Sequence, residues 1–281
     1  MIVDSQVHVW AADRPDRPWP RDSGAHVQRP VPLSGDDLLT EMDAAGVDAA
    51  ILVPPAWEGQ RNDVALDAAH RFPSRFAVMG RLPFDTPDSR DRLREVKYLR
   101  GLPGLRVNLR PPAMRARLRD GTLDWLWEQA EADGLKLMVY TALDLPSLGS
   151  IAERHPRLRL AIDHMGIAAE DRGEAAFRHL PDLIALARHG NIAVKASALP
   201  CIAADAYPYR SLHDPIRRVF DAFGPGRVFW GTDLTRLPCS YRQAVTLFTG
   251  ELPWLTGADL ALVMGEALCR WLDWHPAGAA R

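Results

Sequence analysis

Short runs of apolar and β-branched residues alternate with longer segments of helical periodicity along almost the whole chain. Runs of about four to eight such residues are typical of buried strands, and apolar residues spaced three and four apart are typical of amphipathic helices. The predicted strands are 2–9, 49–54, 76–81, 105–109, 135–140, 158–163, 192–196 and 228–231. The predicted helices lie near 35–45, 61–72, 87–100, 121–133, 146–154, 173–189, 210–223, 241–249 and 257–274.

This alternation of strand and helix predicts parallel βαβ units, and eight such units predict a (β/α)8 TIM barrel of the α/β class. Ser34, followed by Asp37, predicts a helix N-terminus, while Gly46 and Gly134 predict helix ends. The competing architecture is a doubly wound open sheet, but the GxGxxG turn typical of that fold does not follow the first strand. No break in composition suggests a linker, so we expect residues 1–281 to form a single domain.

Composition and charge narrow the classes of partner. The 34 Lys and Arg residues nearly balance the 36 Asp and Glu residues, so the chain lacks the basic excess of nucleic-acid-binding proteins. No stretch approaches the ~18 consecutive apolar residues of a membrane helix, and the N-terminus does not resemble a secretory signal. The three cysteines form no CxxC pair. We therefore expect a cytoplasmic protein with a small-molecule substrate, no nucleic-acid or membrane partner, and the option of a homo-oligomer.

Polar residues gather where the predicted strands end. In TIM barrels the active site forms at the carboxyl ends of the strands. The residues at these ends are Asp4, Gln6 and His8; Arg106, Asn108 and Arg110; Tyr140 and Thr141; Asp163 and His164; Lys195 and Ser197; and Asp233 and Arg236. Each alone has a structural alternative, such as a hydrogen-bonded histidine or half of a buried ion pair. Together they predict a site for a charged substrate or a metal, because burying so many ionisable groups without partners is costly.

Several of these segments resemble the amidohydrolase superfamily, in its amidohydrolase-related branch of lactonases and decarboxylases. The segment DSQVHVW at 4–10 resembles the opening strand of that branch, in which one residue separates two histidines. The fourth, sixth, seventh and eighth strands of the branch are resembled by GLRVNLR at 104–110, AIDHMG at 161–166, VKASAL at 194–199 and VFWGTDLTRLP at 228–238. The resemblance implies one TIM-barrel domain and a hydrolase.

The sequence departs from the metal-binding pattern of that branch in two places. Gln6 stands where the first histidine is expected, and Tyr140 ends the fifth strand where metal-dependent relatives carry another histidine. One divalent ion, zinc or manganese, would be left with His8, His164, Asp233 and possibly Gln6, and three such ligands can still hold a catalytic zinc. Because the loss resembles lactonases of this branch that work without a metal, we expect no cofactor and keep the metal as the alternative.

The residues permit hydrolysis of a small carboxylated or sugar-derived lactone. We expect Asp233 to act as the general base for water, and His8 and His164 to polarise the carbonyl. The guanidinium groups of Arg106 and Arg110 suit a carboxylate on the substrate. Further candidates for substrate contacts are Asn108, Tyr140, Lys195 and Trp10.

Three other functions stay open on the sequence. A hydrolase of the same branch that opens a cyclic amide would use the same residues. A metal-dependent decarboxylase of an aromatic carboxylic acid is the next, although the two missing histidines argue against it. A barrel that binds a metabolite without turning it over is the last, and the retained Asp233 argues against that function.

Overall fold

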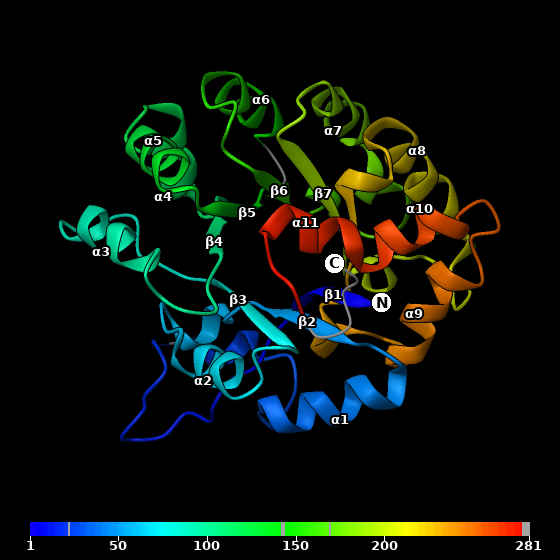
Figure 1. Cartoon of the computed structure of the whole chain (residues 1–281), viewed down its shortest axis with the longest axis horizontal. Coiled ribbons are helices and arrows are strands. Elements are labelled where there is room, and N and C mark those ends of the chain that lie inside the picture. The colour runs from blue at the N-terminus through cyan, green and yellow to red at the C-terminus, as the bar shows by residue number, and fades with distance from the viewer. Residues whose placement is uncertain (22, 142–143, 169, 277–281) are drawn as a thin grey trace.

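Eight parallel strands follow one another in chain order around the molecule, and the helices lie outside them (Figure 1). The computed structural model describes residues 1–21, 23–141, 144–168 and 170–276. The strands are β1 (Val3–Val7), β2 (Ala49–Leu52), β3 (Phe76–Gly80), β4 (Gly104–Asn108), β5 (Lys136–Tyr140), β6 (Leu160–Ile162), β7 (Ile192–Ala196) and β8 (Val228–Trp230). This arrangement confirms the predicted (β/α)8 barrel. The assignment of all of 1–281 to one domain stays a prediction, and residues 277–281 lie outside the described part.

The helices also follow the predicted order. They are α1 (Gly35–Ala45), α2 (Asp63–Arg71), α3 (Ser89–Val96), α4 (Pro112–Arg119), α5 (Asp124–Asp133), α6 (Leu145–Arg154), α7 (Leu180–Ala185), α8 (His213–Phe223), α9 (Tyr241–Thr249), α10 (Gly257–Ala261) and α11 (Ala267–Leu272). Ser34 caps α1 by accepting a hydrogen bond from the Asp37 amide, and Gly46 ends that helix with a φ of 78°. The caps that the sequence predicts are therefore present.

Two predicted helices are shorter or more broken than the periodicity suggested. Within 173–189 only α7 is α-helical, with 3₁₀ turns on either side. The predicted helix 257–274 is interrupted by a π turn at Leu262–Glu266. Gly265 in that turn packs against β1 so closely that an added Cβ would lie 2.7 Å from Val3 Cγ2. The sequence also missed α4, because its first residue is the second of two prolines, although proline fits the first turn of a helix well.

Two apolar cores hold the barrel. One lies between the strands and the surrounding helices. The other fills the inside of the barrel and joins residues such as Val3, Met138 and Phe229 to Leu268 and Leu272 of the C-terminal helix. In Figure 1 this helix, α11, crosses in front of the ring of strands. The C-terminal helix therefore covers the end where the strands begin, and the carboxyl ends of the strands remain for a site.

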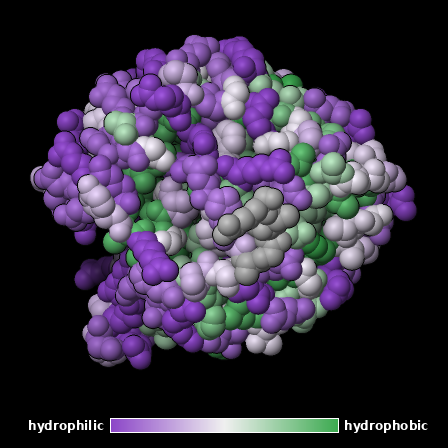
Figure 2. All heavy atoms as spheres, in the orientation of Figure 1, coloured by the Kyte–Doolittle hydropathy of each residue, from purple (hydrophilic) through white to green (hydrophobic). Residues whose placement is uncertain are grey.

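Hydrophilic residues predominate on the face shown in Figure 2. The exposed large apolar side chains of the described residues are Val31, Tyr98 and Leu99, which do not form a single run along the chain. No helix in the described ranges combines the length and the apolar character needed to cross a bilayer.

The seam between β8 and β1 is built around the buried carboxylate of Asp4. Asp4 accepts hydrogen bonds from the Thr232 amide at 2.9 Å, the Gln6 amide at 3.0 Å and the Tyr241 hydroxyl at 2.8 Å, as well as from the Thr232 hydroxyl. Gly231 permits this approach, because an added Cβ would collide with the side chain of Ser5. Burial raises the pKa of Asp4 to about 6, against the opposing effect of the hydrogen bonds. The residue is therefore a structural part of the barrel closure.

We expect Asp4→Asn to lower the free energy of unfolding by about 2–3 kcal/mol, because an amide group would place its own N–H donors against buried donors. Urea unfolding at pH 8, where Asp4 is ionised, measures the effect. Asp16→Asn is the matched control, since the Asp16 side chain is 73% exposed. Equal stability of the two variants would show that the seam does not depend on this carboxylate.

Candidate active site

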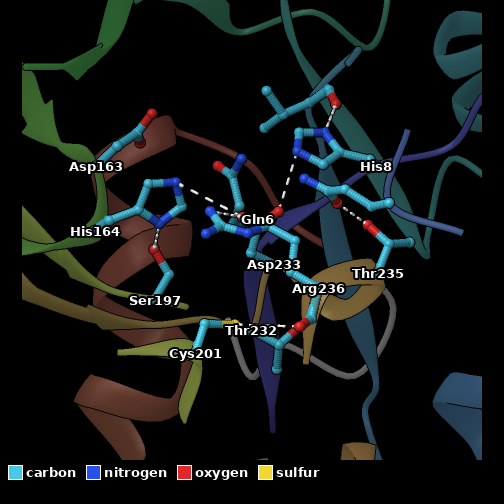
Figure 3. Close-up of polar contacts among 12 residues, drawn as sticks. Gln6, His8, Asp163, His164, Ser197, Cys201, Thr232, Asp233, Thr235 and Arg236 are labelled. Carbon is cyan, nitrogen blue, oxygen red and sulfur yellow. Dashed lines mark hydrogen bonds and ion pairs between the residues drawn. The ribbon is translucent and has the colours of Figure 1, made fainter. Parts of the chain in front are cut away.

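Three side chains from different strands meet at the carboxyl end of the barrel (Figure 3). His8 follows β1, His164 follows β6, and Asp233 follows β8. His8 Nε2 lies 3.1 Å from Asp233 Oδ1, and His164 Nε2 lies 4.0 Å from Asp233 Oδ2. All three side chains are buried. The structure thus brings together the three residues that the sequence proposes for the chemistry.

The backbone turns sharply where two of these residues leave their strands. His164 and Asp233 both have a φ of 53°, in the left-handed region. Residues other than glycine adopt this region at a cost of about 1–2 kcal/mol, and such residues cluster at functional sites. The Asp233 amide donates to the Gln6 carbonyl at 2.9 Å, which ties the turn after β8 to β1.

The Nδ1 atom of each imidazole is held by a hydrogen bond. His8 Nδ1 lies 2.5 Å from the Val53 carbonyl oxygen, and a carbonyl can only accept, so this nitrogen carries a proton. His8 Nε2 then faces the Asp233 carboxylate. This contact is favourable when Nε2 is also protonated or when a cation lies between the two groups. His164 Nδ1 lies 2.9 Å from Ser197 Oγ, which orients the second ring.

Burial and neighbouring charges set the ionisation of the site. Burial lowers the pKa of His164 to about 4, so its imidazole is neutral at neutral pH. Burial alone would raise the pKa of Asp233, but the facing His8 imidazole, through its charge and its hydrogen bond, and the Arg236 guanidinium hold that pKa well below its usual range. Arg236 Nη1 lies 3.3 Å from Asp233 Oδ2. The site therefore presents one ionised carboxylate between two imidazoles.

A buried ion network lies beside these three residues. The Asp163 carboxylate pairs with Lys195 Nζ at 2.8 Å and with Arg106 Nε at 2.7 Å. Burial would raise the pKa of Asp163, but Lys195 and Arg106 hold it below its usual range. Lys195 also donates to Gln6 Oε1. The oxygen of Gln6 is thereby committed to Lys195.

Tyr140, Arg110 and Asn108 occupy the side of the mouth formed by β4 and β5. The guanidinium carbons of Arg106 and Arg110 lie 4.8 and 5.1 Å from the centroid of the Tyr140 ring. The Tyr140 and His164 rings form a T-shaped pair with centroids 5.2 Å apart. Arg110 Nη1 donates to the Tyr140 hydroxyl at 3.2 Å, and its Nη2 pairs with Glu170. The Asn108 side chain accepts from the Arg110 amide. These predicted substrate-binding residues form one connected cluster with Arg106.

Trp10 and Lys195 occupy more interior positions than the sequence suggested. Trp10 is 2% exposed and packs edge-on against Trp57, with ring centroids 5.3 Å apart. Trp57 in turn lies against His8, at 5.7 Å between centroids. Lys195 is fully buried in the ion network. Both side chains are buried, and direct substrate contact by Trp10 or Lys195 stays a prediction.

The sequence reasoning missed Arg81, the residue that follows β3. Arg81 is buried and lines a pocket together with Arg106 and Asn108. Its position as the last residue of the predicted strand 76–81 was the available signal. No recognised motif included it, and a single arginine at a strand end is usually an ion-pair partner.

The residues of the site fit a divalent metal poorly. The donors that such an ion would use are His8, His164 and Asp233, since the Gln6 oxygen accepts from Lys195 and an amide nitrogen is not a metal ligand. Gln6 Nε2 itself is buried and has no hydrogen-bond partner among the described residues. Nor do the described ranges contain any group of three or more His, Cys, Asp or Glu side chains arranged to hold a metal ion.

Comparison with known proteins places the chain in a family and beside several relatives. A family model described as amidohydrolase matches residues 3–271. An L-fucono-1,5-lactonase of Burkholderia ambifaria is 26% identical over 232 residues, which cover 82% of this chain and 79% of the relative. A 4-sulfomuconolactone hydrolase of Hydrogenophaga intermedia is 28% identical over 206 residues, which cover 70% of this chain and 64% of the relative.

The fold has many solved counterparts. One is the crystal structure of an amidohydrolase from Burkholderia multivorans with bound zinc, which superimposes with a TM-score of 0.79 over 98% of this chain and 99% of the other. The two sequences are 24% identical. At that identity the similarity establishes the shared barrel and says nothing of a metal in this chain.

Proposed function

The chain belongs to the amidohydrolase family and is a hydrolase, and from this premise we propose that it opens a small carboxylated or sugar-derived lactone. The observation that carries the proposal is the ionised Asp233 carboxylate, buried beside His8 and His164 at the mouth of the barrel. Two relatives named for lactone hydrolysis support this choice of substrate over a cyclic amide.

Asp233 is the proposed general base. Its carboxylate is ionised at neutral pH but is a weak base while His8 and Arg236 face it. When the substrate carbonyl binds against His8, it competes with Asp233 for the imidazole proton, and the carboxylate becomes more basic. Asp233 then takes a proton from water as the water oxygen adds to the carbonyl carbon. Positioned acid–base groups of this kind contribute about 10²–10⁴ in rate.

His8 and His164 polarise the carbonyl and stabilise the oxyanion that forms. Val53 and Ser197 fix the two rings, so little reorganisation is needed during the reaction. The tetrahedral intermediate collapses by breaking the ring C–O bond. Asp233 returns its proton to the departing ring oxygen, so the product is the open-chain hydroxy acid or its keto form. The reaction consumes one water for each lactone opened.

The surrounding residues bind and orient the substrate. Arg106 uses its Nε for Asp163, which leaves its other guanidinium nitrogens for a carboxylate. Arg110, Asn108 and Tyr140 provide further polar groups on the same side of the mouth. Lys195 acts by holding Asp163 and Gln6 in place, and Trp10 by supporting Trp57 behind His8.

We expect Asp233→Asn to lower kcat by about 10²–10⁴-fold while substrate binding persists, because only the base is lost. The assay follows acid release from a panel of lactones in weak buffer with a pH indicator. Asp221→Asn is the control, since Asp221 lies on the solvent side of α8. Turnover by Asp233→Asn at the parent rate would remove Asp233 from this role. Carbon dioxide release from aromatic acids, with no lactone opened, would favour the decarboxylase instead.

The proposed reaction needs no metal, because His8 and His164 polarise the carbonyl by hydrogen bonding. We expect elemental analysis of the untreated protein to find well under one equivalent of zinc or manganese, and a chelator to leave lactone hydrolysis unchanged. A full equivalent of either metal, together with loss of activity on chelation, would contradict this part of the proposal. His8, His164 and Asp233 would then be its ligands, and the ion would supply Lewis acidity at the carbonyl.

A further inference from the structure

A cavity of about 260 Å³ opens at the carboxyl ends of β3 and β4. Its lining includes Arg81, Arg106, Asn108, Phe84, Met114 and Arg117. Arg106 links this cavity to the active site, because it pairs with Asp163 and lies over the Tyr140 ring, which contacts His164. The cavity therefore adjoins the residues that are proposed to hold the substrate.

Arg81 lies in this cavity without a counter-ion. Only 8% of the residue is exposed. Its Nε donates to the Gly59 carbonyl at 3.1 Å, and its Nη1 is buried with no hydrogen-bond partner in the described part of the chain. None of the ion pairs among the described residues involves its guanidinium, and the charge that acts on its pKa is the like charge of Arg106. Burying a cation without a counter-ion costs free energy. The presence of Arg81 at this position therefore indicates an anionic ligand that pairs with its guanidinium.

The charges around Arg81 strengthen this argument. Burial and the charge of Arg106 lower the pKa of Arg81 to about 10, which leaves the group cationic at neutral pH. Arg106 already shares the Asp163 carboxylate with Lys195. Asp85, at the rim of the cavity, is exposed and pairs with neither arginine. The cations of this region therefore outnumber the buried anions, as they would in a site built to receive an anion.

We propose that Arg81 and Arg106 form an anion subsite that binds an acidic substituent of the lactone, a carboxylate or a sulfonate. The planar guanidinium fork suits the paired oxygens of either group, and Phe84 and Met114 provide apolar surface for the carbon skeleton. This inference rests on the proposed function and narrows its substrate class from lactones in general to acidic lactones. Arg81 is then the residue that distinguishes an acidic lactone from its neutral counterpart.

The first test compares Arg81→Met with the parent enzyme on muconolactone, its methyl ester and 4-sulfomuconolactone. We expect kcat/KM for the acidic lactone that the enzyme prefers to fall about 10- to 100-fold through KM, since a hydrogen-bonded charge contact is lost. The ester should change by less than about twofold. Because 4-sulfomuconolactone carries a sulfonate as well as a carboxylate, a fall that is confined to it identifies the sulfonate, and an equal fall on muconolactone identifies the carboxylate. Arg81→Lys should restore part of the lost kcat/KM, and Arg92→Met on the outside of α3 is the surface control.

Thermal unfolding separates this function from a structural one. Because the Arg81 cation has no counter-ion in the described structure, we expect Arg81→Met to keep the parent Tm or to raise it. A lower Tm, with equal loss of activity on acid and ester, would make Arg81 a structural residue and overturn the proposal.

Binding of glutarate, measured by isothermal titration calorimetry, separates failure of the subsite from failure of the lactonase assignment. Glutarate carries two carboxylates and no lactone. Binding that Arg81→Met abolishes supports the subsite, even if the parent protein opens no lactone. A parent enzyme that opens lactones but treats acid and ester alike, with neither affected by Arg81→Met, would overturn the subsite and leave the lactonase function intact.

Discussion

The buried contact between the Asp233 carboxylate and the His8 imidazole is the interaction on which the site depends. It joins the end of β8 to the end of β1. The Asp4 carboxylate bridges the same two strands through its hydrogen bond with Thr232, and it also accepts one from Tyr241. The Val53 carbonyl fixes the proton on His8 Nδ1, so Nε2 can face the carboxylate favourably only with a second proton or a cation. The same contact keeps Asp233 ionised in a buried position, and the Nε2 atoms of both imidazoles face this carboxylate.

The network around Asp163 commits the oxygen atoms of Asp163 and Gln6 to cationic side chains. Lys195 takes the oxygen of Gln6 and one oxygen of Asp163, and Arg106 takes the other. Because Lys195 and Arg106 share one carboxylate, the network carries a net positive charge beside the imidazoles. This charge favours a negatively charged substrate, and Arg81 adds a further cation in the neighbouring cavity. In the proposed function, substrate binding and the reaction both depend on these buried charges.

Much of the fold and the centre of the site were predictable, because they depend on local patterns. Strand and helix alternation gave the barrel, and the placement of His8, His164 and Asp233 at strand ends followed from it. Side-chain partners were less predictable. Arg81 and Trp10 both lie at the ends of predicted strands. Arg81 lines a cavity, whereas Trp10 packs against Trp57. Such differences arise from contacts between residues far apart in the chain, which periodicity does not encode.

The most direct measurement of the central contact is the ¹⁵N NMR spectrum of the His8 ring, assigned by comparison with a His8→Gln variant. Because Nδ1 donates to the Val53 carbonyl and Nε2 faces the Asp233 carboxylate, we expect a proton on each ring nitrogen of His8. A ring whose Nε2 has no proton, or one with the shift of a metal-bound nitrogen, would contradict this prediction.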